Sequence, residues 1–240
     1  YCRTGGSGLT LSTISVVFDF DCSLATSFVG GMMFNGYIPE SKLEIARERF
    51  QSDTTSLRLY QEEVFDSVSQ TPAEMSQRAA DGAEIRPLAQ QLCDEVRKTG
   101  GSVVVASAGL DFYIKPVLDR ANLDQLVIHS GIVISDPTCP PPFRYDYPSS
   151  GDACEGDWVT CKCKVIKDLR DAVADSEVIF IGDGLGADVC AATNAADKIF
   201  ARGRLLAYCK ENDISVTEFG DDFGPVLSYV KNKTSANGAQ

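Results

Sequence analysis

The 240-residue sequence predicts a doubly wound α/β fold, in which a parallel, Rossmann-like sheet carries helices on both faces. It also predicts a small helical cap inserted after the first strand. Short apolar runs typical of buried parallel strands alternate with helical periodicity over the second half of the chain. Between residues 24 and 84 the periodicity is helical, and no apolar run there indicates a buried strand.

The first predicted strand is the apolar run Ile14–Phe18, and two acids follow it without a break, at Asp19 and Asp21. Side chains alternate across a strand, so acids two residues apart point to the same place. The carboxyl end of a strand in an open α/β sheet is where ligands bind. Two carboxylates there are costly unless a positive group joins them, and that group is usually a metal ion.

The helical stretch that follows contains two clear amphipathic segments, Leu43–Phe50 and Leu57–Phe65. Because it lies between the first and second strands, we expect it above the carboxyl edge of the sheet, as a lid. The chain is thereby divided into an α/β core of residues 1–23 and 85–240 and a cap of residues 24–84.

Strands and helices then alternate in order along the core. Helices are predicted at 86–99, 110–120, 165–173, 187–196 and 205–211, and strands at 102–106, 126–128, 132–134, 178–181 and 198–201. The stretch 136–158, rich in Pro, Gly, Asp and Ser, predicts a loop or an irregular hairpin. Such alternation is typical of parallel strands joined by crossover helices.

Composition narrows the possible functions. A hydrophobic fraction of 44% and a charged fraction of 23% are typical of a soluble globular protein. The net charge of -12 argues against electrostatic binding to nucleic acid or to an anionic membrane, and no apolar stretch reaches the ~18 residues of a membrane span. Nine irregularly spaced cysteines favour a reducing compartment, so we expect a cytoplasmic protein. Since the chain begins at Tyr1 rather than Met, we expect its N-terminus to be incomplete.

Further polar residues lie at the ends of the predicted strands. Ser107 and Gly109 follow the second strand, Lys162 opens the helix before the strand at 178–181, and that strand is followed by Asp183 and Asp188. In a doubly wound sheet these points converge on one crevice. Acids for a cation, a hydroxyl with a glycine turn for an anion, and a fixed positive charge are the parts that phosphoryl transfer requires.

These motifs resemble, in order, the four motifs of the haloacid dehalogenase superfamily: Val17–Ser23, Val105–Gly109, Lys162 and Ile181–Gly184. The likeness spans residues 14 to about 211. Within the superfamily the chain is similar to the phosphoserine-phosphatase-like branch, which has a helical cap near the first motif. It is closer still to phosphoethanolamine/phosphocholine and 2-hydroxy-3-keto-5-methylthiopentenyl-1-phosphate phosphatases, through Ser107–Ile114, Cys161–Ile166 and Ile199–Cys209.

The resemblance implies a Mg²⁺-dependent phosphatase that hydrolyses a small phosphorylated metabolite through an aspartyl-phosphate intermediate. Asp19 would be the nucleophile and a magnesium ligand. Asp21 would be the general acid and base, and would give its backbone carbonyl to the metal.

The resemblance also implies roles for the remaining motif residues. Ser107, Gly109 and Lys162 would bind the substrate phosphate. Asp183 would complete the magnesium site. Asp188 would support it as a ligand, through a water molecule, or by holding the other ligands in place.

The chain departs from the superfamily pattern at the first and last motifs. Cys22 stands at a tight turn where glycine is usual, while Ser23 replaces the commoner threonine and keeps its hydroxyl. The two last acids are five residues apart, where close relatives usually have four. Lys164 is a rival of Lys162, but a helical period that starts at Cys161 favours Lys162.

Two other functions fit part of the pattern. A receiver-type signalling module also combines acids, a hydroxyl and a lysine in a parallel sheet, but it has neither a helical insert after the first strand nor a second carboxylate two residues after the first. The other alternative is a catalytically weakened relative used for binding or regulation, which Cys22 and the longer acidic spacing favour.

Overall fold

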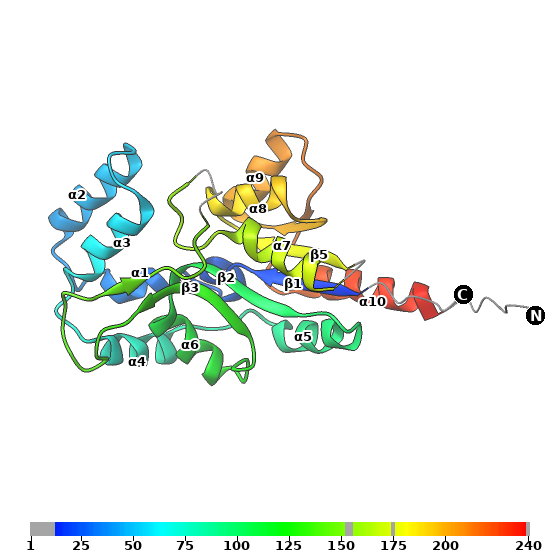
Figure 1. Ribbon diagram of the computed structural model, residues 1–240, viewed down its shortest axis with the longest axis horizontal. Helices are drawn as coiled ribbons and strands as arrows, with labels where there is room; N and C mark the ends of the chain where they lie inside the picture. Colours follow the sequence, from blue (N-terminus) through cyan, green and yellow to red (C-terminus); the bar gives the residue numbers. More distant parts are fainter. Residues whose placement is uncertain (1–12, 152–155, 174–175, 239–240) are drawn as a thin grey trace, which may run out of the picture.

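The structure, a computed structural model of the chain, describes residues 13–151, 156–173 and 176–238. Seven strands form one sheet in the order β4-β3-β2-β1-β5-β6-β7 (Figure 1). All neighbouring strands pair in parallel except β3 and β4, which are antiparallel. The strands are β1 (Ile14–Phe18), β2 (Val103–Leu110), β3 (Val127–Val133), β4 (Tyr145–Asp146), β5 (Glu177–Gly182), β6 (Lys198–Ala201) and β7 (Thr217–Glu218).

Strand β1 lies at the centre of the sheet, between β2 and β5. The chain builds outward from β1 first on the β2 side and then, after crossing over, on the β5 side. The strand order therefore reverses at β1, and the loops that leave the carboxyl ends of β1 and β5 diverge to form a crevice. This is the predicted doubly wound sheet, and it places the crevice directly above Asp19.

Helices cover both faces of the sheet (Figure 1). Alternate residues of β1 point to opposite sides, because Ile14, Val16 and Phe18 belong to one buried cluster and Val17 to the other. The first cluster includes residues of α5 (Ala89–Lys98), α6 (Asp111–Arg120) and α10 (Gly224–Gly238). The second includes residues of α7 (Lys162–Ala172), α8 (Ala187–Asn194) and α9 (Gly203–Glu211). Both faces of β1 are thus buried, which explains its unbroken apolar sequence.

Four helices lie between β1 and β2: α1 (Val29–Phe34), α2 (Glu40–Gln51), α3 (Leu57–Phe65) and α4 (Pro72–Gly82). Within residues 24–84 the structure contains no strand, and the helical prediction for this stretch is confirmed. Helix α4 packs along α6, whereas α2 and α3 stand together beyond the edge of the sheet (Figure 1). A capping box between Thr71 and Glu74 starts α4, because each side chain bonds the other residue's backbone amide.

Two predicted elements differ from the structure. The separate strands expected at 126–128 and 132–134 are one strand, β3, because Gly131 between them pairs with Leu110 of β2. Leu110 itself belongs to β2, which runs four residues further than predicted. The irregular hairpin is confirmed, since β4 returns antiparallel to β3, although residues 152–155 of that stretch lie outside the described residues.

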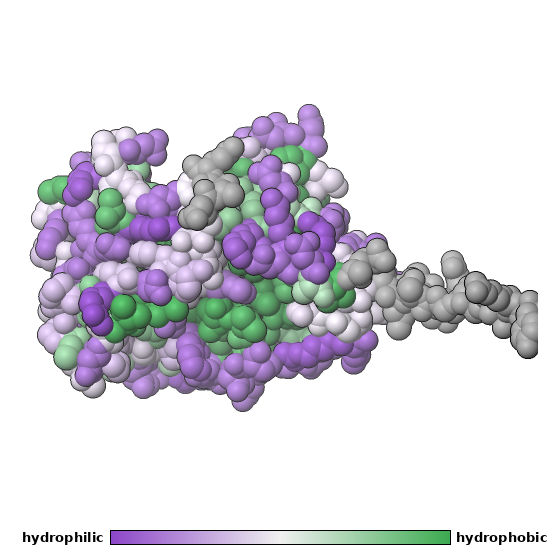
Figure 2. Space-filling view, in the orientation of Figure 1, coloured by the Kyte–Doolittle hydropathy of each residue, from purple (hydrophilic) through white to green (hydrophobic). Residues whose placement is uncertain are grey.

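The surface that the molecule turns toward the viewer in Figure 2 is mostly hydrophilic. Apolar residues gather across its middle, in the region of β3, where Val127 is 57% exposed. Among the described residues, no helix has both the length and the apolar character needed to cross a membrane.

Candidate active site

A buried lysine joins two of the predicted acids at the carboxyl edge of the sheet. Lys162 is the first residue of α7, and its Nζ lies 2.5 Å from Asp19 Oδ1 and 2.5 Å from Asp188 Oδ1. Asp19 directly follows β1, and Asp188 lies in the first turn of α8. Lys164, its sequence rival, is exposed and pairs with Asp168, so the lysine at this site is Lys162.

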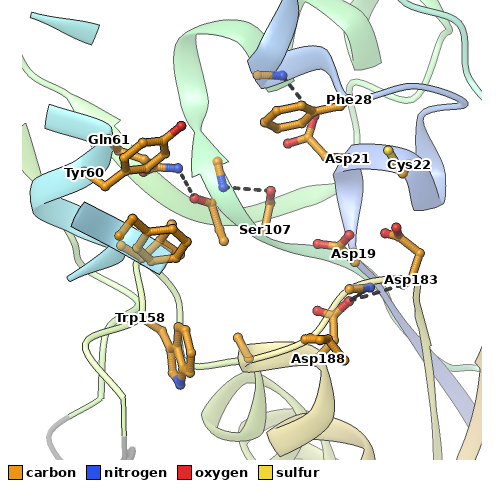
Figure 3. Close-up of a pocket in the computed structure, with 18 of the residues that line it drawn as sticks. Asp19, Asp21, Cys22, Phe28, Tyr60, Gln61, Ser107, Trp158, Asp183 and Asp188 are labelled. Carbon is orange, nitrogen blue, oxygen red and sulfur yellow. Dashed lines mark hydrogen bonds between the residues drawn. The ribbon is translucent and has the colours of Figure 1, made fainter. Parts of the chain in front are cut away.

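Asp183 brings a third carboxylate to the cluster (Figure 3). Asp19, Asp183 and Asp188 can each place one oxygen within 4.8 Å of the others. Burial raises the pKa of Asp19 well above its ordinary value, against the opposing charge of Lys162, and the nearby Asp188 raises it further. Burial and Asp188 also raise the pKa of Asp183.

One ammonium does not balance these three acids. Burial lowers the pKa of Lys162, but the charges of Asp188 and Asp19 outweigh burial and raise that pKa above its usual value. Lys162 is therefore charged, and ionisation of all three carboxylates leaves two negative charges in excess. Closely spaced carboxylate oxygens in negative excess are the donor set that Mg²⁺ prefers, so these residues fit a magnesium ion.

The five-residue spacing of the last two acids is accommodated by the loop between β5 and α8. The amides of Asp183 and Gly184 donate to Asp188 Oδ2 at 3.2 and 2.8 Å. Gly186, at φ +64°, precedes the helix, in a conformation that L side chains rarely adopt. The longer loop thus still delivers Asp188 to the cluster.

The tight turn at residues 20–24 follows the nucleophile candidate. The amide of Leu24 donates to the Asp19 carbonyl, and Cys22 has φ +60°, which explains why glycine is usual at this position. Burial, followed by the charges of Asp183 and Asp21, raises the pKa of the Cys22 thiol to about 11, so the thiol stays protonated near neutral pH. Ser23 Oγ donates to Asp183 Oδ1 at 3.0 Å and so joins the turn to β5.

Arg86 supports this turn and was not predicted as a site residue. It is 2% exposed, and its guanidinium donates to the carbonyls of Ser23 (2.8 Å), Cys22 (3.0 Å) and Gly220 (3.0 Å). Among the described residues it makes no ion pair with a carboxylate. An arginine beside a proline at a helix start carries no signal of this role in the sequence.

The Asp21 carboxylate belongs to a separate environment above the acid cluster (Figure 3). Its Oδ1 accepts the Gly30 amide at 3.0 Å and its Oδ2 accepts the Tyr113 hydroxyl at 3.2 Å. Burial raises the pKa of Asp21 to about 6, although these donors oppose the shift. A carboxyl with this pKa can both give and take a proton near neutral pH. Tyr113 lies inside a motif that the sequence singled out, but its type alone did not indicate this contact.

The predicted phosphate-binding residues Ser107 and Gly109 lie in the last four residues of β2. Ser107 is buried, and its Oγ accepts the Gly109 amide at 3.0 Å. Gly109 must lack a side chain, because a Cβ there would lie 2.0 Å from the Tyr113 hydroxyl. Gln61 of α3 donates to the Ala108 carbonyl at 2.6 Å, and this bond joins the end of β2 to the helices after β1. The structure brings all seven predicted site residues to one cavity, while their individual roles stay predictions.

This cavity has a volume of about 680 Å³, a size typical of small-molecule sites. Its floor is formed by the acids, Lys162 and Ser107. The helices after β1 form one wall, and Trp158 lies on another (Figure 3). Arg58 of α3 donates to the Trp158 carbonyl at 2.8 Å and pairs with Asp157, and these bonds link the two walls.

Known proteins resemble the chain in sequence and in fold. Residues 16–193 match the family model of haloacid dehalogenase-like hydrolases. A 2-hydroxy-3-keto-5-methylthiopentenyl-1-phosphate phosphatase from Bacillus cereus (strain B4264) is 27% identical over 222 residues, which cover 91% of this chain and 96% of the relative. A protein of the same name from Exiguobacterium sibiricum is 26% identical over 151 residues, 62% of this chain and 64% of the relative.

Two solved structures of phosphoserine phosphatase share the fold. A phospho-aspartyl intermediate analogue has a TM-score of 0.63 and 14% identity, and covers 91% of this chain and 99% of that chain. A substrate-bound complex has a TM-score of 0.64 and 13% identity, and covers 91% of this chain and 98% of that chain.

Proposed function

The chain belongs to the haloacid dehalogenase-like hydrolases, and we propose that it is a phosphatase, a phosphoric monoester hydrolase that acts on a small phosphorylated metabolite with Mg²⁺ as cofactor. The observation that carries the proposal is the buried contact between Asp19 and Lys162 on the floor of a cavity, with Asp21 nearby in an environment of its own. Relatives that align along most of the chain are named as phosphatases of a small metabolite.

The proposed reaction has two steps, and the same two carboxylates, Asp19 and Asp21, act in both. In the first, an Asp19 oxygen attacks phosphorus, the bond to the leaving oxygen breaks, and Asp21 protonates that oxygen. An alcohol leaves and an aspartyl-phosphate remains. In the second, ionised Asp21 takes a proton from a water that attacks phosphorus, the bond to Asp19 breaks, and inorganic phosphate is released.

The remaining residues bind and orient the phosphate. The Lys162 ammonium and the Ser107 hydroxyl would hold its oxygens, and Ser23 holds Asp183 in place through its hydrogen bond. Asp19, Asp183 and the Asp21 backbone carbonyl would hold Mg²⁺, with Asp188 in support. When bound, the ion supplies positive charge that neutralises the phosphate oxygens and the excess of acids.

The proposal is tested by phosphate release from general phosphomonoesters, measured with and without Mg²⁺. Asp19→Asn removes the nucleophile and is expected to lower kcat by roughly 10³-fold or more. Asp168→Asn is the matched control, because that acid is exposed and pairs with Lys164 on the surface, and it should behave as wild type. Wild-type protein that releases no phosphate in the presence of Mg²⁺, or no more than Asp19→Asn, would contradict the proposal.

A further inference from the structure

We propose that the leaving group of the substrate is an uncharged, mainly apolar alcohol, which packs against the helices between β1 and β2. This inference rests on the proposed function, because it concerns the part of the same cavity that lies beyond the phosphate. It follows from the kinds of side chain that line that part and from the partners that its single cation already has.

The wall formed by residues 24–84 is largely apolar. No aspartate or glutamate is among the described residues that this stretch contributes to the cavity. Its apolar and aromatic members are Phe28, Phe34, Phe50, Leu57, Tyr60, Val64 and Phe65.

These side chains form an apolar layer that contains two groups of aromatic rings in contact. Phe50 and Tyr60 stack at 5.1 Å between ring centroids with an interplanar angle of 22°. Phe34 and Phe65 meet edge to face at 5.9 Å and are almost fully buried, so the layer is backed by the hydrophobic core. Trp158 also lines the cavity and lies below Tyr60 in the view of Figure 3. Such a surface gains free energy when an apolar group covers it.

The one cation of this wall, Arg47, has partners of its own. Its guanidinium donates to Glu40 at 3.1 Å and to Asn35 at 3.0 Å, so those donors are not directed at a substrate carboxylate. Because Glu40 balances the charge of Arg47, the pair offers no net charge to a substrate carboxylate or ammonium. A charged leaving group would therefore lose water without gaining an oppositely charged partner, which is costly, because the other polar side chains of this wall, Gln51 and Gln61, are neutral. The other arginine that lines the cavity is Arg204. It lies at the phosphate end, where its charge opposes the rise that burial causes in the pKa of Asp183.

A panel of phosphomonoesters that differ only in the leaving group tests the inference. We expect kcat/KM of the wild-type protein to rise from ethyl to butyl to hexyl phosphate, by about threefold to fourfold for each methylene buried. The kcat/KM for hexyl phosphate should be higher than that for phosphoserine, phosphoethanolamine or phosphocholine. A preference for any of these charged esters over butyl phosphate overturns the inference.

A gain of specificity provides the second arm. Leu57 lines the cavity at the first position of α3, where a glutamate suits the helix N-terminus. Leu57→Glu should raise kcat/KM for phosphocholine relative to hexyl phosphate by roughly tenfold, because a carboxylate then faces the ammonium. Leu59→Glu is the matched control on the same helix, since Leu59 is 57% exposed and does not line the cavity. Equal ratios in the two variants count against the inference.

Binding separates this inference from the proposed function. If p-nitrophenyl phosphate and every other ester resist hydrolysis, the proposed function fails, and calorimetry with phosphonates, which cannot be hydrolysed, still decides the leaving-group preference. Hexylphosphonate that binds more tightly than 2-aminoethylphosphonate supports the inference, and the reverse order overturns it.

Discussion

Asp21 shows how one residue receives a role from its surroundings rather than from its type. It lies two positions after Asp19, yet its carboxylate is held by the Gly30 amide and the Tyr113 hydroxyl instead of by Lys162. Burial raises the pKa of both carboxyl groups, that of Asp19 well above its ordinary value although the Lys162 charge opposes the shift, and that of Asp21 to about 6. Two carboxylates in different environments are thereby suited to attack and to proton transfer.

The pKa of Asp21 predicts the pH dependence of the first step. Because the protonated form must give its proton to the leaving oxygen, kcat/KM for an alkyl phosphate is expected to fall as the pH rises above about 6. Tyr113→Phe removes a donor that stabilises the carboxylate, so this falling limb should move to higher pH. The pH profiles of wild type and variant check both expectations.

Tyr145→Phe is the control for the loss of a phenol hydroxyl, because Tyr145 bonds Asp66 and does not line the cavity. Its profile should match that of wild type. A Tyr113→Phe limb that stays in place or moves to lower pH would show that Asp21 is not the group that titrates.

The position of residues at strand ends in the site could be predicted from the sequence. Asp19, Ser107 and Asp183 are examples, because parallel strands end at a common edge and the residue types match one reaction. Tyr113 and Arg86 could not be predicted, since their contacts depend on how helices and turns pack in three dimensions. A tyrosine or an arginine at those positions is compatible with many surroundings.

At the scale of elements, the turn at residues 20–24 depends on parts of the chain that are distant in sequence. Arg86, just before α5, binds two carbonyls of the turn and one of Gly220, which precedes α10. Its guanidinium also lies 5.4 Å from the Phe219 ring centroid. One planar side chain therefore joins β1, α5 and α10 at the base of the site.

Arg86→Met is expected to lower the free energy of unfolding by about 3 kcal/mol or more, because three carbonyls lose their donors in a buried place. Arg86→Lys keeps the charge without the planar set of donors and should recover part of that loss. Denaturation with urea, followed with phosphate release on the same samples, measures both effects.

Arg97→Met is the control, since Arg97 lies at the exposed end of α5 and pairs with Asp94. A surface pair of this kind contributes about 1 kcal/mol at most. Similar unfolding free energies for Arg86→Met and Arg97→Met would show that Arg86 does not support the turn.

Most elements of the core could be predicted because each has a strong local pattern. The buried strands read as apolar runs and α5 as a helix with one apolar face. Helix α10 was not predicted, because its buried residues Val226 and Val230 are followed by a polar stretch that hides the period. Strand β7 has two residues, too few for any pattern.

For the whole molecule, the fold class followed from the alternation of strands and helices, and the position of the site followed from the strand order. The shape of the cavity could not be predicted, because its outer wall depends on how α2 and α3 are set against the sheet. Gln61 makes its contact with the Ala108 carbonyl and Arg58 with the Trp158 carbonyl and Asp157, and a backbone carbonyl leaves no signal in a sequence.

The charge of the whole molecule leads to a prediction about stability. The protein has a net charge of -12, and three of its acids, of which Asp19 and Asp188 are buried, lie close together in the site. A divalent ion that binds there and not to the unfolded chain stabilises the folded state, by about 2.7 kcal/mol at a concentration 100 times its Kd. Mg²⁺ should therefore raise the Tm of the wild-type protein, as measured by calorimetry.

Asp183→Asn removes one of the three carboxylates and should abolish most of that rise. Asp168→Asn, an equal change of charge at an exposed position, should leave the rise intact. An identical response of the two variants to Mg²⁺ would mean that the ion acts on the surface charge as a whole and not at the acid cluster.

The bond between Arg86 and the Gly220 carbonyl has a consequence for the order in which the protein is made. The ribosome synthesises the turn after β1 early, but residue 220 leaves it later than every residue that lines the cavity. During translation Arg86 therefore lacks one of its three carbonyl acceptors and also its aromatic neighbours, Phe219 and Phe223. The nascent chain can complete the contacts of the turn at residues 20–24 only after every residue that lines the cavity has emerged.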